Sequence, residues 1–534
     1  MKTTSVDVLI VGAGPVGLFL ATALSRDGLQ VLLVDKMHER TFFTKALGIT
    51  ARTLELFDDF GIVQDAIDAG TWLYGVTTFN DGAPGPSMDI PDILPFGSLS
   101  LAQYEAERIL EACLHRHGGT VDYGWTLTSF DETADGVHAE LSGPDGATRS
   151  VESRFIVGCD GGRSAVRSGL ELSLEGGQFP QTFVLADLEI DWNLPRGRFY
   201  RFNLSAGGER PATTLVAVPV AGSVRRYRLS TVLPDALLHT GEGERPTPPS
   251  FDEICAFMTP LLPEGTRLDT MHWSSVYRVN HLIVSSYAKG RGFLAGDAAH
   301  MHPPVGGQGL NTGLQDAYNL AWKLALAQRG RASAGLLESY SSERRAVGLD
   351  LVENTSRALN ETLAQRSPLP GMRETQLLVT YRGSSIVRDE RGDPSQEGIA
   401  AGDRVPDAGG LRRTYVGLPF RLHERLGRGR HVLFCYAADE AVLEALVEIG
   451  CLAKKALGEA VSCFAIVPKD CALADREDMP LLHDADGEFA ATFGAASGMT
   501  WLIRPDGYIG WFGPTPSPEG LEAALGLIAE PTAA

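Results

Sequence analysis

The first 35 residues hold the pattern that most restricts the fold. Val6 to Val11 is an almost unbroken apolar run, which predicts a strand buried on both faces, and Gly12-Ala-Gly14-Pro-Val-Gly17 follows it directly. A helical pattern then extends to about Asp27, and a second apolar strand, Val31 to Val34, ends at Asp35. This order of strand, glycine turn, helix, strand and acid predicts a dinucleotide-binding unit in an α/β protein.

Each glycine of this motif has its own steric role. Gly12 allows the tight turn, Gly14 lets the backbone approach a pyrophosphate, and Gly17 lets helix and strand pack closely. Pro15 suits the first turn of a helix, where its missing N–H costs little. The pyrophosphate is expected at the helix N-terminus, and the carboxylate of Asp35 is expected to accept hydrogen bonds from a ribose.

A second cofactor motif lies beyond the middle of the chain. Gly292 to Asp297 reads as a short apolar strand that ends at an acid, and a Pro/Gly turn, Pro303 to Gly309, follows. A helical pattern from Leu310 to about Gln328 then has its N-terminus facing whatever the turn encloses. One dinucleotide held at both motifs is expected to be FAD, because this helix N-terminus can offset negative charge on a reduced flavin.

Charge and composition limit the partners of the chain. Its 534 residues give room for about two to four domains. The formal charge of -20, from 47 basic and 67 acidic residues, argues against nucleic acid or an anionic membrane as the main partner. No apolar run approaches the roughly 20 residues of a membrane span, so a cytoplasmic protein is expected. Seven cysteines without C-x-x-C or zinc spacing predict reduced thiols and no structural metal.

The pattern between Phe179 and Tyr277 changes to short β-rich segments. Strands are expected at Phe183 to Ile190, Arg198 to Leu204, Thr213 to Val220 and Arg226 to Val232. They predict an antiparallel sheet, residues 179–277, inserted between two parts of the nucleotide domain, 1–178 and 278–390. A Pro/Gly-rich stretch within residues 72–98 is expected to cross to this inserted sheet.

A smaller domain, residues 400–534, is expected at the end of the chain. The charged and Gly-rich segment Arg382 to Asp403 is the expected linker. Further strands are expected at Val432 to Tyr436, Cys463 to Val467, Thr500 to Ile503 and Tyr508 to Trp511. The chain is therefore expected to contain three structural units.

Three motifs in this order resemble a known family. They are Gly12-x-Gly14-x-x-Gly17, the Asp160-Gly161 segment, and Gly296-Asp297 with Pro303-Pro304-x-Gly306-Gly307-x-Gly309-Leu310-Asn311. Over roughly residues 5 to 370 the chain resembles the single-component FAD-dependent aromatic hydroxylases with the para-hydroxybenzoate hydroxylase fold. The tail resembles the C-terminal thioredoxin-like domain of the phenol and polyketide hydroxylase branch, through Asp484-Ala-Asp-Gly487 and the hairpin Ile503 to Tyr508. Without C-x-x-C, this domain is expected to lack disulfide exchange.

The resemblance implies an FAD-dependent monooxygenase. It implies a Rossmann-like FAD-binding domain, an inserted antiparallel β-sheet substrate domain and a thioredoxin-like C-terminal domain. NADPH or NADH would reduce FAD, and O2 would form a flavin C4a-hydroperoxide that transfers OH to a phenolic or polyketide-like aromatic substrate. A Baeyer-Villiger or epoxidising monooxygenase is the alternative within the enzyme class, and a non-catalytic binding protein on the same scaffold is the alternative outside it. A homodimer is the expected assembly.

The resemblance also implies residue roles. Asp35 is expected at the adenosine ribose, Asp297 at the ribityl chain and Pro304 near the reactive C4a carbon. Lys45 stands where the family usually has arginine, so Arg52 is expected to carry more of that contact. The full set of expected FAD contacts is Gly12, Gly14, Pro15, Val16, Gly17, Asp35, Lys36, Lys45, Arg52, Gln103, Leu127, Asp160, Asp297, Pro304, Gly307, Gly309, Leu310 and Asn311. The expected NADPH contacts are Arg163 and Arg167.

Histidines and aromatic residues complete the candidate site. His300 is expected to be a structural part of the turn, whereas His302, held extended by Pro303, is expected to tune the hydroxylation step. In this family the inserted sheet forms the ceiling of the substrate pocket. Aromatic residues in strands more often pack in the core than line a ligand. The substrate candidates are Trp72, Phe96, Tyr200, Phe202, Tyr227, Trp273 and Tyr277.

Overall fold

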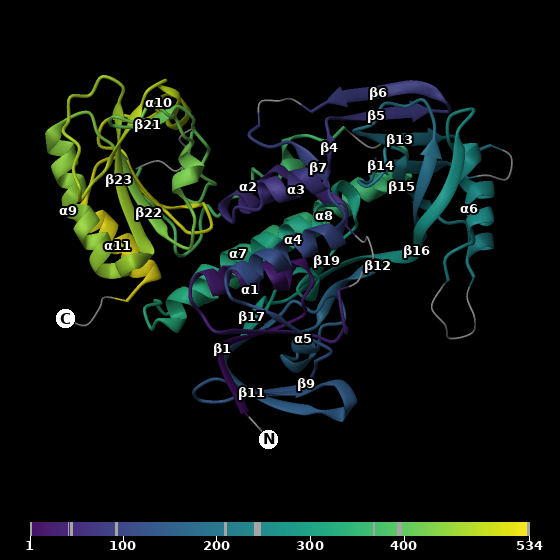
Figure 1. The fold of residues 1–534 in the computed structure, drawn as a ribbon, viewed down its shortest axis with the longest axis horizontal. Coiled ribbons are helices and arrows are strands. Elements are labelled where there is room, and N and C mark those ends of the chain that lie inside the picture. The colour runs from purple at the N-terminus through teal and green to yellow at the C-terminus, as the bar shows by residue number, and fades with distance from the viewer. Residues whose placement is uncertain are drawn as a thin grey trace.

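The computed structural model describes residues 3–40, 42, 46–90, 94–207, 211–239, 247–366, 369–391 and 398–530. Three units follow from its sheets, and Figure 1 shows the third of them, green to yellow, to one side of α2 (Ala51–Asp59) and α7 (Gly309–Gln328). A small sheet of β3 (Gly48–Ile49), β7 (Ser98–Ser100) and β4 (Thr71–Leu73) is formed by the chain between β2 (Val31–Asp35) and β8 (Val121–Tyr123) of the first unit. None of the described helices is long and apolar enough to cross a membrane.

The first unit contains the glycine motif. The main strand order is β17 (Ala288–Lys289), β18 (Gly292–Leu294), β11 (Thr148–Gly158), β1 (Thr3–Val11), β2 (Val31–Asp35) and β8 (Val121–Tyr123). β9 (Thr126–Glu132) and β10 (Val137–Ser142) add a hairpin to β11. The pairs from β18 to β8 are parallel, and Val8, Leu9 and Ile10 are fully buried because helices cover the sheet. α1 (Pro15–Arg26) packs against α7 and α4 (Gln103–Arg116).

The second unit is a mostly antiparallel sheet. Its order is β19 (His300–Met301), β16 (Arg267–Val284), β12 (Leu174–Asp191), β15 (Arg226–Val232), β14 (Thr213–Pro219), β13 (Arg198–Leu204), β5 (Gly75–Asn80) and β6 (Ala83–Asp89). β12 continues through the boundary expected at residues 178/179, and β16 continues through the boundary expected at residues 277/278. The Pro/Gly-rich stretch forms β6, and as an edge strand it tolerates Pro84 and Pro86, which cannot donate to a ladder. α6 (Phe251–Met258) covers one face of this sheet.

The third unit has the strand arrangement of a thioredoxin-like domain. Its order is β20 (Arg388–Asp389), β26 (Ile509–Gly513), β25 (Thr500–Ile503), β22 (His431–Tyr436), β23 (Val461–Pro468), β24 (Leu481–Asp484) and β21 (Leu411–Arg413). The helices of this unit are α9 (Glu440–Leu457), α10 (Glu488–Phe493) and α11 (Pro518–Ile528). β22 is parallel to β23 and antiparallel to β25. β20 pairs with β26, so part of the expected linker belongs to this sheet.

The remaining helices connect the units. α3 (Val63–Ala69) follows α2, and α5 (Ala165–Gly169) follows β11. α8 (Glu338–Leu363) is the longest helix described, and it contacts α7, β14 and β16. Because α7 begins at the Pro/Gly turn and also borders the third unit, it links the cofactor motif to the rest of the molecule.

Candidate functional site

The glycine turn between β1 and α1 leaves space at Gly14. Gly12 has φ +103°, and a Cβ atom there would lie 2.5 Å from the carbonyl oxygen of Cys159. A Cβ atom at Gly17 would lie 1.9 Å from the carbonyl oxygen of Gly12, whereas at Gly14 it would meet no described atom within 4 Å. No described side chain caps the N-terminus of α1. Free space beside uncapped N–H groups fits the pyrophosphate of FAD.

Asp35 ties the end of β2 to the glycine turn. Its Oδ2 accepts a hydrogen bond from the Ala13 N–H (2.7 Å), and its Oδ1 accepts one from the Met37 N–H (2.8 Å). Each carboxylate oxygen has a second acceptor site, so the half-buried carboxylate also suits a ribose. Lys36 is exposed next to it.

Three further expected FAD contacts have different outcomes. Lys45 lies outside the described residues. Gln103, the first residue of α4, accepts a hydrogen bond from the Ala46 N–H (3.2 Å) and donates one to Glu107 (2.8 Å), so it holds the loop that precedes β3. The side chain of Leu127 is buried in the core of the first unit, and the FAD contact expected of this residue stays a prediction.

Arg52 on α2 is held by contacts within its own helix and with the third unit. Its Nη1 donates to Glu55 (2.8 Å) and its Nη2 donates to the carbonyl oxygen of Asp506 in the third unit (2.7 Å). Its guanidinium also lies 5.3 Å from the ring centre of Tyr508. A partner 454 residues away in the chain therefore holds this side chain, and the FAD contact expected of Arg52 stays a prediction.

The two cofactor motifs touch at Gly296. This residue has φ +60°, and a Cβ atom there would lie 3.0 Å from Cγ2 of Val16 on α1. Asp297 is exposed although the residues on both sides of it are buried, so its carboxylate lies at the edge of the joined motifs. Pro304 is exposed on the following turn. This placement fits the ribityl and ring half of FAD next to the pyrophosphate half.

Asn311 fastens the start of α7 to β3. Its Nδ2 donates to the carbonyl oxygens of Gly48 (2.9 Å) and Gly307 (2.7 Å), and its Oδ1 accepts from the Thr50 N–H (2.9 Å). A Cβ atom at Gly307 would lie 3.2 Å from the Cα atom of Gly48, so this contact requires glycine. No side chain in the described ranges caps the N-terminus of α7, where Leu310 is half-buried. This positive helix end suits the electron-rich edge of a flavin.

The Asp160 loop is held by its own side chains. Oδ2 of Asp160 accepts a hydrogen bond from the first N–H of α5 (2.6 Å), and its Oδ1 is buried without a partner among the described residues. Arg167 donates to the carbonyl oxygens of Gly162 (2.8 Å) and Ala298 (3.0 Å). Arg167 therefore braces the loop against the Asp297 turn, and the NADPH contact expected of it stays a prediction. Arg163 is exposed.

The substrate candidates divide between the two faces of the second sheet. Tyr200, Phe202 and Tyr227 are buried in the cluster that α6 covers, so the expectation that they line a substrate pocket is wrong. Side chains alternate along a strand, and strand pairing places Trp273 and Tyr277 on the opposite face. That face is the one directed toward the cofactor turn.

An apolar cluster joins this face to the cofactor turn. Tyr277 stacks on Phe183, with ring centres 5.7 Å apart, and the same cluster contains Val305, which directly follows Pro304. Its other members are Phe179, Val232, Val279, Leu359 and Leu363. Sequence reasoning missed Phe183 and Val305, because only the pairing of β12 with β16 shows which side chains share a face.

A charged pair lies beside Trp273 on the same face. Arg228 forms two hydrogen bonds with the buried Asp187 (2.7 and 3.0 Å), and its guanidinium lies 5.3 Å from the Trp273 ring centre. Trp72 is 39% exposed on β4, and Phe96 packs against the core of the first unit. Neither belongs to the apolar cluster around Tyr277.

The two histidines of the turn have different environments. His300 is buried, and its Nε2 donates to Asp316 (2.9 Å), which supports the turn. Nδ1 of His302 donates to the Pro303 carbonyl oxygen (2.8 Å), so Nε2 carries the lone pair of the neutral ring. Burial, followed by the charge of His300, lowers the pKa of His302 to about 4. A Cβ atom at Gly309 would lie 2.9 Å from this Nε2, so a neutral imidazole packs against the start of α7.

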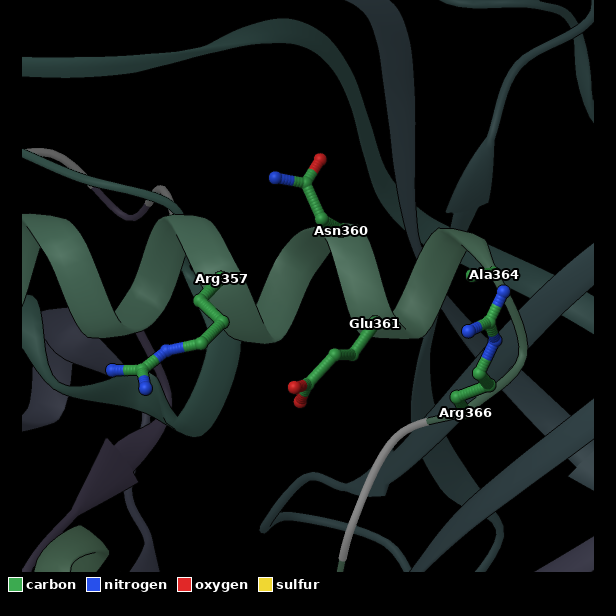
Figure 2. Close-up of a pocket in the computed structure, with 5 residues that line it drawn as sticks. All are labelled: Arg357, Asn360, Glu361, Ala364 and Arg366. Carbon is green, nitrogen blue, oxygen red and sulfur yellow. The ribbon is translucent and has the colours of Figure 1, made fainter.

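A separate hollow of about 420 Å³ lies along the end of α8. Figure 2 shows that Arg357 and Glu361 extend to one side of the helix and Asn360 to the other, while Arg366, beyond the end of the helix, points back toward Ala364. Four of the five lining residues are charged or polar, whereas the cluster around Tyr277 is apolar.

Comparisons with known proteins agree with this geometry. A family model described as an FAD binding domain matches residues 5–355. The 6-methylpretetramide 4-monooxygenase of Streptomyces rimosus is 31% identical over 557 residues, which cover 99% of this chain and 95% of that protein. Aklavinone-11 hydroxylase, solved with FAD and aklavinone, is 25% identical with a TM-score of 0.77, over 98% of this chain and 99% of that chain.

A third relative supports the fold. The flavin-dependent monooxygenase PieE, solved with FAD and substrate, has a TM-score of 0.81 at 24% identity and covers 98% of this chain and 99% of that chain. The agreement extends over all three units, because these matches span nearly the whole chain. The chain belongs to the FAD binding domain family and is a flavin-dependent monooxygenase of the phenol and polyketide hydroxylase branch.

Proposed function

We propose that this enzyme uses NADPH or NADH, together with O2, to hydroxylate a polycyclic phenolic substrate. The apolar cluster that joins Phe183 and Tyr277 to Val305 carries this proposal, because it provides aromatic surface next to the cofactor turn. Relatives named for 6-methylpretetramide and aklavinone support a polycyclic substrate class. Arg163, exposed near the Asp160 loop, is the proposed nicotinamide nucleotide contact.

FAD supplies the redox and oxygen chemistry when it is bound. Gly14 and the start of α1 are proposed to hold its pyrophosphate, and Asp297 its ribityl chain. The start of α7 would face the pyrimidine part of the flavin, with Pro304 at the edge nearest the substrate. The cluster around Tyr277 excludes water from the reacting ring.

The remaining parts of the proposal concern organisation. Residues 1–178 with 278–390, 179–277 and 400–534 are proposed as the three domains, with 72–98 crossing to the second. A homodimer is proposed because closed twofold assemblies are the commonest among soluble oligomers. A cytoplasmic location is proposed because all seven cysteines are free thiols in the structure.

Anaerobic flavin reduction tests the proposed function. The purified enzyme is mixed with NADPH or NADH, and the loss of flavin absorbance is followed with and without phenols and aromatic polyketides. We expect one nucleotide to be preferred and one polycyclic phenol to accelerate reduction at least about tenfold, a typical scale for coupled sites. In air, product mass spectrometry should show one added oxygen atom, and NMR should show an intact ring skeleton. Ester insertion would instead indicate Baeyer-Villiger chemistry.

Tyr277 tests the proposed substrate site, and Trp72 provides the matched control. Tyr277→Ala should abolish substrate acceleration and leave the slow basal reduction unchanged, because it removes the ring stacked on Phe183. Trp72→Ala removes an aromatic residue outside this cluster and should retain acceleration. Equal loss in both variants would contradict the assignment of the pocket.

His302 is proposed to tune the hydroxylation step as a neutral acceptor. His302→Ala should lower the fraction of oxidised NAD(P)H that yields hydroxylated product, because it removes the Nε2 lone pair beside the start of α7. Since the pKa of His302 is about 4, turnover by the parent should show no His302 ionisation between pH 6 and 9. Product yield per NAD(P)H, measured across this range, checks both points. Unchanged yield in the variant would rule out the role.

A further inference from the structure

A buried carboxylate on α7 contacts the cofactor turn. Asp316 is fully buried, and its Oδ2 accepts hydrogen bonds from the Gly296 N–H (3.1 Å) and from Nε2 of His300 (2.9 Å). Gly296 and His300 stand on either side of Asp297. One carboxylate oxygen therefore fixes both ends of the short segment that presents Asp297.

The other oxygen of Asp316 connects the turn to α8. Its Oδ1 accepts a hydrogen bond from Nε of the buried Arg344 (2.7 Å). Burial acts to raise the pKa of Asp316, but Arg344 and His300 outweigh it and hold this pKa below its ordinary value. Asp316 is therefore an anion at neutral pH, and it provides a charged acceptor to the turn.

Arg344 extends this connection toward the third unit. Its Nη2 donates to the Thr312 carbonyl oxygen on α7 (3.1 Å), and its Nη1 donates to the hydroxyl of Tyr381 (2.8 Å). The ring of Tyr381 lies 4.3 Å, centre to centre, from the ring of Tyr508 in the third unit. A continuous set of contacts thus leads from the C-terminal unit to the turn.

We propose that Asp316 is a positioning residue for FAD, and that Arg344 and Tyr381 hold it in place from the C-terminal side. This inference rests on the proposed FAD contacts at Gly296 and Asp297. If Asp316 only stabilised the fold, its removal would weaken the apo and FAD-bound forms equally. If it positions the turn, its removal must weaken FAD binding itself, and FAD must stabilise the variant less than the parent.

The first test is Asp316→Asn, which keeps the size of the side chain and removes its charge. FAD is removed from the purified protein, and its return is titrated by the change in flavin fluorescence. We expect the Kd for FAD to rise about tenfold, within the usual range of coupling between sites. The rise in melting temperature on FAD addition should also shrink. A lowered apo melting temperature with an unchanged Kd would overturn the inference.

Tyr381→Phe gives a second and milder test, which decides the matter if Asp316→Asn does not fold. It removes only the hydroxyl that accepts from Arg344, and we expect the Kd for FAD to rise about threefold, below the effect at Asp316. Tyr508→Phe is the matched control, because its buried hydroxyl has no hydrogen-bond partner in the described part of the chain. Equal FAD affinity in these two variants would overturn the inference. A parent that binds no FAD would instead refute the cofactor site and the inference with it.

Discussion

Gly14→Ala should fold like the parent and lose FAD. An added Cβ atom meets no described atom within 4 Å, and Gly14 has φ -69°, which alanine adopts without strain. Alanine is a poorer helix N-cap than glycine, but it also restricts the unfolded chain, so the stability of the apo form should change by less than about 0.5 kcal/mol. In the complex, the new methyl group would occupy the space for the pyrophosphate. FAD affinity should therefore fall at least about 100-fold, or about 2.7 kcal/mol.

Gly17→Ala separates this steric effect from damage to the fold. Its Cβ atom would lie 1.9 Å from the carbonyl oxygen of Gly12, so α1 must move away from β1. We expect about 1–3 kcal/mol of lost stability in the apo form, the usual range for overpacking. Apo melting temperature and FAD titration by fluorescence are measured for both variants. Full FAD affinity in Gly14→Ala would place the pyrophosphate elsewhere.

Local patterns explain why the nucleotide-binding unit was predictable. β1, the Gly12 turn and α1 follow each other directly, so strand burial, turn conformation and helix start are all set by neighbouring residues. The same holds for α7, which begins within one residue of the expected position. β6 was missed because Pro84 and Pro86 read as a loop, and only their place at a sheet edge allows a strand.

The substrate face could not be predicted from one sequence. Tyr227 and Tyr277 both lie in strands of the same sheet, and only the position of α6 on one face decides which of them packs in the core. Arg52 shows the same limit, because the carbonyl that holds it comes from the third unit. Contacts over hundreds of residues leave no periodic signal in the chain.

The seam between α7, α8 and the third unit contains a buried ionic cluster. Glu343 on α8 accepts two hydrogen bonds from Arg504 (2.7 and 2.9 Å), one from Lys323 (2.9 Å) and one from Asn319 (2.7 Å). Burial acts to raise the pKa of Glu343, but Arg504 and Lys323 outweigh it and hold this pKa well below its ordinary value. The thioredoxin-like unit is therefore fixed to α7 and α8 by charge as well as by apolar packing.

Glu343→Gln should destabilise this seam strongly. Burial already lowers the pKa of Lys323 to about 8, so Lys323 can shed its proton once the carboxylate is gone. Arg504 cannot lose its proton, so Asp506 alone would then neutralise its charge. We expect the free energy of unfolding, measured with urea at pH 7, to fall by about 3–5 kcal/mol, as for other buried pairs that lose one partner. Because the folded-state pKa of Glu343 is depressed, the parent should lose this contribution as the pH falls below about 4.5, and the variant should not.

Asp350→Asn is the matched control on the same helix. Asp350 also pairs with an arginine, Arg373, but both side chains are more than half exposed. Water and salt screen such a pair, so its loss should change the free energy of unfolding by less than about 1 kcal/mol. If both variants lost the same stability, burial would not be the cause, and the ionic cluster would not be what holds the third unit to α7. If only Glu343→Gln lowers the free energy of unfolding strongly, and if its difference from the parent shrinks at low pH, the buried carboxylate of Glu343 is the group that stabilises this contact.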